Sequence, residues 1–159
     1  MHFDDYPPEA LCRIFELIAN KSKYTIPTES RRRLLRGFTY LYAARDRHFG
    51  NGRTSRNSFE RSVRHLANRI STMKEVTREL LTTLEPEDIE VAGVMPAHLK
   101  AMADKPGKVR VHCDCEPQVI DDTLLGTEIE CPACGKTFLA DWGEPVIDLP
   151  QPEEEAETE

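Results

Sequence analysis

Apolar residues recur every three or four positions along the first part of the chain, which is the spacing of amphipathic helices. The pattern predicts helices over residues 7–21, about 28–47 and about 53–73, with shorter helical turns at 77–81 and 85–89. In the third helix, the residues expected to be buried are Phe59, Val63, Leu66, Ile70 and Met73. Each apolar stripe must be buried against another, so residues 1–92 are expected to form a small helical bundle.

The pattern changes in the second half of the chain. Residues 93–108 contain prolines and glycines and are predicted to be a linker, with at most a short helix around residues 96–103. Apolar and polar residues then alternate within 109–142, which indicates short antiparallel strands. Residues 143–159 are rich in acids and proline, and we expect them to be a disordered tail. The predicted fold class is therefore α plus small β.

Charge is divided unevenly between these parts. The 159 residues include 21 basic and 28 acidic side chains, a net charge of -7. Residues 1–92 carry +3 and residues 93–159 carry -10, so only the first part is suited to facing phosphate or nucleic acid. No apolar run approaches the about 20 residues of a membrane span. The acidic start also lacks the features of a secretory signal, so we expect a cytoplasmic protein without membrane contact.

Four of the five cysteines lie close together in the predicted strand region. Cys113 and Cys115 precede Cys131 and Cys134, and the second pair lies in the sequence C-P-A-C-G. Two pairs of thiolates on tight turns can supply the tetrahedron of ligands that zinc prefers. We therefore predict a structural Zn²⁺ bound by these four residues, with Gly135 allowing a backbone N–H to approach a cysteine sulfur.

Other interpretations of the cysteines stay open at this point. The pairs also fit a redox role, an iron site or a chance cluster, and His112 is an alternative ligand in place of Cys113. A closed site of four cysteines has no open coordination position, which disfavours catalysis there. The fifth cysteine, Cys12, lies on an apolar helical stripe and is interpreted as a small buried side chain.

A glycine-rich turn precedes the third predicted helix. Residues 49–57 read F-G-N-G-R-T-S-R-N, which places Arg53 in the first helical turn. An arginine at a helix start can bind a phosphate group. The alternative from the residues alone is a solvated, arginine-rich helix. The chain contains no G-x-x-x-x-G-K-[ST] sequence for a phosphate-binding loop.

These features together resemble a known family. F-D-D-Y at residues 3–6, F-G-N-G-R-x-x-R-N at 49–57 and L-T-T-L at 81–84, in this order, resemble the C-terminal lid of AAA+ ATPases of the SpoVK, CbbX and EccA type. The resemblance implies a helical bundle that packs on a P-loop ATPase core. It also implies that Arg53 is the sensor-2 residue that reaches the nucleotide phosphates, whereas Arg56 and Asn57 serve packing or contacts between subunits.

The second half resembles zinc ribbons of the C-x-C-G and C-P-x-C-G kind, although Glu116 stands where such ribbons often have glycine. The combined resemblance implies the lid and zinc-ribbon portion of an AAA+ ATPase. Such a portion couples nucleotide state to neighbouring subunits and binds an unidentified protein partner through the ribbon. The chain alone is expected to have no catalytic activity, and ATP or ADP would bind only with an AAA+ core in cis or in trans. The alternatives are a free-standing adaptor and, less favoured by the charge, a nucleic-acid-binding ribbon protein.

Overall fold

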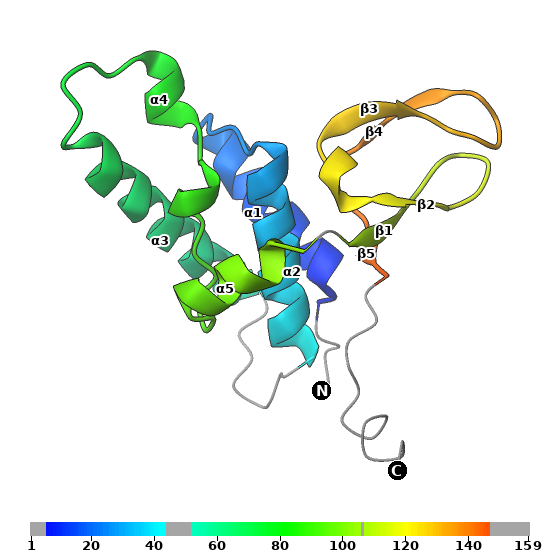
Figure 1. The fold of residues 1–159 in the computed structure, drawn as a ribbon, viewed down its shortest axis with the longest axis horizontal. Helices are drawn as coiled ribbons and strands as arrows, with labels where there is room; N and C mark the ends of the chain where they lie inside the picture. Colours follow the sequence, from blue (N-terminus) through cyan, green and yellow to red (C-terminus); the bar gives the residue numbers. More distant parts are fainter. Residues whose placement is uncertain (1–5, 44–51, 106, 147–159) are drawn as a thin grey trace, which may run out of the picture.

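The computed structural model describes residues 6–43, 52–105 and 107–146. Its helices form a bundle that lies beside a small group of strands (Figure 1). The helical elements are α1 (Pro8–Lys21), α2 (Thr28–Ala43), α3 (Gly52–Ile70), α4 (Arg78–Thr82), the 3₁₀ turn η1 (Pro86–Asp88) and α5 (Pro96–Ala103). The predicted helical bundle is thereby confirmed, and the helix ends that fall within residues 44–51 lie outside the described residues.

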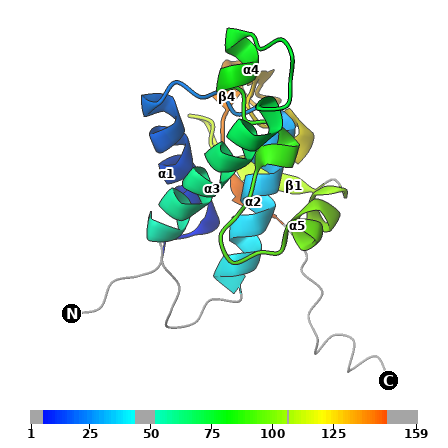
Figure 2. The same ribbon diagram turned by 90° about the vertical axis from the view of Figure 1, so that its left-hand side faces the viewer.

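Three helices provide most of the bundle core. α1 packs against both α2 and α3, and the rings of Phe15 and Phe59 meet edge to face with their centroids 5.6 Å apart. Phe38 of α2 is fully buried in the same cluster. α5 packs along α2, and in Figure 2 the helix α2 lies between α1 and α5. These contacts bury the apolar stripes that the sequence pattern predicts.

α3 is buried through serines as well as through its apolar stripe. Ser55, Ser58 and Ser62 are all fully buried, although sequence spacing assigned the buried face to larger side chains. The Ser55 hydroxyl donates to the Leu11 carbonyl at 2.8 Å. Met73, which was expected to be buried, is 38% exposed because α3 ends at Ile70.

The strands form two small antiparallel sheets. The first has the order β2-β1-β5 and the second pairs β3 with β4. Their bounds are β1 (Lys108–Val111), β2 (Gln118–Asp121), β3 (Thr127–Glu130), β4 (Thr137–Ala140) and β5 (Glu144–Pro145). β1 pairs with β2 so that Val109 lies opposite Ile120. The short antiparallel strands predicted for this region are thus confirmed.

The ends of the strand region contain two further features. Residues 144–145 lie within the segment predicted to be an acidic tail, but they pair with β1 through Val109 and Arg110. Residues 147–159 of that segment lie outside the described residues. None of the described helices is both long enough and apolar enough to cross a membrane.

Candidate functional site

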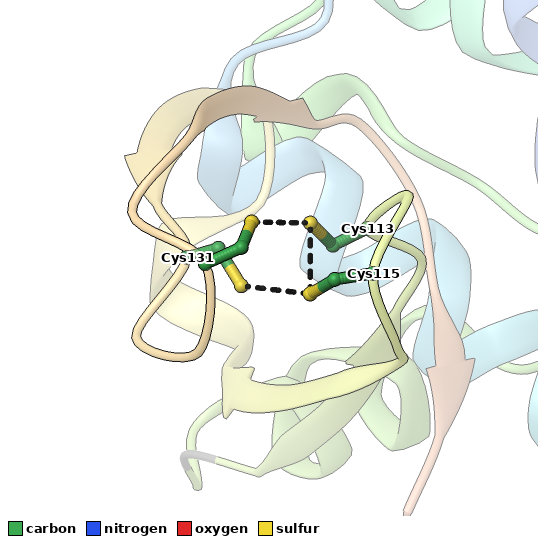
Figure 3. Close-up of side chains that lie close together, drawn as sticks. Cys113, Cys115 and Cys131 are labelled. Atoms are coloured by element: carbon green, nitrogen blue, oxygen red, sulfur yellow. Dashed lines mark hydrogen bonds between the residues drawn. The ribbon is translucent and has the colours of Figure 1, made fainter.

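The cysteine pairs occupy the two hairpin connections of the strand region. Cys113 and Cys115 lie between β1 and β2, and Cys131 and Cys134 lie between β3 and β4. Figure 3 shows the side chains of Cys113, Cys115 and Cys131 directed toward one another across the gap between the two hairpins. Strands of four residues bring the two turns together, as the sequence predicts.

The sulfur atoms have the separations that a tetrahedral metal site requires. The Sγ atoms of Cys113 and Cys115 are 3.5 Å apart, and Cys113 to Cys134 and Cys115 to Cys131 are also 3.5 Å. All four lie within 4.8 Å of one another. With Zn–S bonds of about 2.3 Å, the sulfurs of a regular tetrahedron are about 3.8 Å apart. The four cysteines are therefore arranged to bind a metal ion, and His112 is not part of this cluster.

Backbone N–H groups favour a thiolate at one of these positions. Burial acts to raise the pKa of the Cys131 thiol, but the N–H groups of Cys134 and Ala133 outweigh burial and lower that pKa to about 7. In contrast, burial together with the neighbouring thiols raises the pKa of Cys115 to about 12. Cysteine ligands bind a metal as thiolates, so metal binding at this cluster would release protons.

Gly135 has a different role from the one expected. Its φ of 79° lies in the left-handed region, and its N–H donates to the Cys131 carbonyl at 2.8 Å rather than to a sulfur atom. This bond closes the turn that contains Cys131 and Cys134. The groups that stabilise the sulfur are the N–H groups of Ala133 and Cys134, which precede Gly135 in the same turn.

The second candidate site is the start of α3. Arg53 follows Gly52 at the first residues of this 19-residue helix and is exposed. It forms no hydrogen bond or ion pair with the described residues, whereas its neighbour Ser55 is anchored on α1. Gly50 and Asn51 of the predicted turn lie outside the described residues. The structure therefore places an exposed guanidinium at a helix N-terminus, where the backbone dipole also favours anions.

A third site was not found by sequence reasoning. It is a cluster of charged residues between α2 and the strands. Asp122, in the 3₁₀ turn η2 (Asp122–Leu124), is 2% exposed and contacts Arg32 and Arg36. Along the sequence, these partners are 90 and 86 residues away from Asp122. The sequence gives only a weak signal for the cluster, the density of arginines over 31–36, because a run of charged residues usually forms a solvated helix face.

Comparison with known proteins assigns the helical part. The model of the AAA lid domain matches residues 7–98, which is more than half of the chain. The chain belongs to the AAA lid domain family. This result confirms the resemblance drawn from the sequence. The matched residues of the AAA lid domain include Arg53 and end before β1, so the cysteine cluster lies outside them.

Two curated proteins are similar to part of this chain. Protein CfxQ homolog of Guillardia theta is 33% identical over 90 residues, which cover 55% of this chain and 30% of that protein. The chloroplastic ribulose bisphosphate carboxylase/oxygenase activase of Cyanidioschyzon merolae (strain NIES-3377 / 10D) is 32% identical over 92 residues. That alignment covers 56% of this chain and 30% of the activase. The chain therefore spans less than a third of the length of each of these relatives.

Proposed function

We propose that this chain is the lid and metal-bearing portion of an AAA+ ATPase of the CbbX and Rubisco-activase type. In this proposal an AAA+ core, in cis or in trans, supplies the nucleotide site, and the lid couples nucleotide state to subunit contacts. The family assignment supports the lid role. The observation that carries the proposal for Arg53 is its exposed position at the start of α3, without a partner among the described residues.

Arg53 acts in this proposal as the sensor-2 residue. Its guanidinium would donate charge-assisted hydrogen bonds to phosphate oxygens of a nucleotide bound to the core. α3 favours this contact because its N-terminus carries a partial positive charge. The buried serines Ser55 and Ser58 determine which face of α3 is buried and leave Arg53 on the outside.

The cysteine cluster has a structural role in the same proposal. Four thiolates around Zn²⁺ leave no open position for substrate or water, so the ion would stabilise the strands rather than react. In this proposal, the cysteine-bearing strands bind a protein partner. Nucleic acid is disfavoured because the arginines of α2 are occupied by internal carboxylates and carbonyl groups, including Asp122, Glu16 and the Lys105 carbonyl.

The test of the lid function is ATP turnover by the AAA+ assembly that contains this chain. Replacing one charged phosphate contact typically costs about 1.5–3 kcal/mol, so Arg53→Ala should lower turnover by roughly 10- to 100-fold. Arg64→Ala is the matched control because Arg64 is another arginine on the surface of α3, far from its N-terminus. Circular dichroism of both variants should match the unmodified chain. Turnover that is unchanged in Arg53→Ala would exclude the sensor role.

A further inference from the structure

The strand region shares a hydrophobic core with the helices. Val109, Leu125 and Trp142 are each at most 1% exposed, and they belong to the same buried cluster as Leu11 and Phe38 of α1 and α2. Domains that are joined only by a flexible linker usually meet through smaller and more polar contacts. The continuous core indicates a fixed position of the strands on the bundle.

Asp122 forms the polar centre of this contact. Its Oδ1 accepts from Arg32 Nε at 2.9 Å, and its Oδ2 accepts from Arg36 Nη2 at 2.9 Å. The backbone N–H of Gly107 donates to Oδ1 at 3.2 Å. Burial acts to lower the pKa of Arg32, but the charge of Asp122 and the hydrogen bond to Glu29 outweigh it and raise that pKa. The guanidinium of Arg32 therefore stays charged, and its attraction to the Asp122 carboxylate persists at neutral pH.

A second anchor lies on the same helix, beside the first. The Arg31 guanidinium donates to the Asp141 carbonyl at 3.0 Å and to Glu16 at 2.6 Å, and it lies 4.8 Å from the centre of the Trp142 ring. Trp142 Nε1 also donates to Glu16 at 2.6 Å. A module fastened at one point can rotate about it, whereas anchors at Asp122 and at Trp142 fix its orientation.

The connecting segment is fastened to the same arginines. Arg36 Nη1 donates to the Met102 carbonyl at 2.8 Å. The Lys105 carbonyl accepts from Arg32 at 3.0 Å and from Arg36 at 2.7 Å. The segment that sequence composition predicts to be a linker is thus bound to α2 up to residue 105. These bonds shorten the free connecting segment about which the strands could change their orientation.

We infer that the cysteine-bearing strands and the helices α1–α3 form one rigid body, in which Asp122 and the arginines of α2 hold the strands against the helices. The cysteine cluster then follows every change in orientation of the lid. This last consequence rests on the proposed lid function, because it requires a lid that moves with nucleotide state. The rigidity itself does not depend on that function.

The test is the measurement of residual dipolar couplings of backbone N–H groups in the full chain loaded with zinc. One alignment tensor should fit the couplings of the helices and of the strands together. Asp122→Ala removes the acceptor of both arginines, and its couplings should require two separate tensors. Asp121→Ala is the matched control, since Asp121 is the adjacent residue but is exposed and pairs with Lys108 rather than with α2; this variant should still fit one tensor.

Either of two results would overturn the inference. Two tensors in the unmodified chain would show that the strands move independently, and this result needs no variant to fold. A single tensor in a folded Asp122→Ala chain would show that Asp122 does not hold the strands against the helices. Should Asp122→Ala lose its strand resonances, Arg36→Ala replaces it. Asp122 then keeps Arg32 but loses its second arginine, and the couplings of this variant should again require two tensors; a single tensor would contradict the role of Asp122 and its arginines. No nucleotide is present in these samples, so the result is independent of any failure of the ATPase proposal.

Discussion

Gly126 lies where the strand region contacts Arg31 of α2. Its φ is 84°, and a Cβ at this position would lie 2.8 Å from Nε of Arg31. Arg31 cannot easily move away, because its guanidinium is bound by Glu16 and by the Asp141 carbonyl. Glycine is therefore required both for backbone conformation and for space.

Replacing Gly126 with alanine should destabilise the chain by about 2–4 kcal/mol. About 1–2 kcal/mol comes from the left-handed backbone, and the rest comes from the displaced Arg31. Gly135→Ala is the matched control, since its φ is 79° but nothing lies within 4 Å of the added Cβ; it should cost only about 1–2 kcal/mol. Urea unfolding of both variants measures the difference. Equal losses would show that the contact with Arg31 has no energetic weight.

Individual residues differ in how far the sequence predicts them. The four cysteines were predictable because metal-ligand spacing is a local pattern. Asp122 was not, because it looks like any other acid until the chain brings it against Arg32 and Arg36. The role of Gly135 was predicted only in part: its position in the turn was apparent, but the partner of its N–H depends on the path of the backbone.

At the scale of elements, α3 is joined to the segment after η1 by polar contacts. The Ser58 hydroxyl accepts from the N–H of Ala92 at 2.8 Å. On the outer side of the same helix, Glu90 accepts from Arg61 at 2.9 Å and pairs with His65 at 2.5 Å. Burial acts to raise the pKa of Glu90, but the hydrogen bonds from Arg61 and His65 outweigh it and lower the pKa.

This lowered pKa predicts a pH-dependent contribution to stability. A carboxyl group with a lower pKa in the folded state stabilises the fold above its unfolded pKa of about 4.3. That contribution disappears as pH falls through the folded pKa. Glu90→Gln should therefore cost up to about 1 kcal/mol at pH 7 and much less at about pH 3. Thermal unfolding at both pH values checks this, with Glu60→Gln of α3 as an exposed control. A loss that is equal at both pH values would contradict the charge interaction.

Elements with strong apolar periodicity were the most predictable. The helix expected over residues 7–21 is observed as Pro8–Lys21, and the short turns at 77–81 and 85–89 appear as α4 and η1. The end of α3 was less predictable, because Met73 continues the apolar spacing beyond the last helical residue. β5 was not expected, because its two residues lie in a segment whose composition is typical of a disordered tail. They nevertheless pair with β1.

At the scale of the whole molecule, the metal site and the bundle are expected to unfold together. If Zn²⁺ supplies much of the folding free energy of the strands, its removal also uncovers the core that Leu125 and Trp142 share with α1 and α2. Chelation should then lower the melting temperature followed by the helical circular dichroism signal by roughly 10 °C or more. The loaded chain should contain one zinc ion by elemental analysis.

Two variants control this prediction. Cys131→Ser should bind no stoichiometric zinc, and chelators should not change its melting temperature. Cys12→Ala removes a buried cysteine outside the cluster, and it should keep both the zinc ion and the response to chelator. A helical melting temperature that does not change when the zinc is removed would show that the two parts unfold separately.

The arrangement of the whole molecule was the least predictable from the sequence. Composition predicts a bundle, a linker and a strand module as successive segments, and each segment does contain the expected kind of element. Composition does not predict which distant residues contact each other. An example is the hydrogen bond that the Thr28 hydroxyl donates to the Leu125 carbonyl at 2.6 Å. Such contacts depend on the assembled fold and leave no periodic pattern along the chain.

Trp142 gives the chain a built-in optical probe. It is the only tryptophan among the 159 residues, and its indole ring is buried between the strands and the helices beside a guanidinium. All tryptophan emission therefore originates at the place where the two parts of the molecule meet. Any event that separates them, such as unfolding or removal of the metal, can be followed by a red shift in that emission without attaching a label.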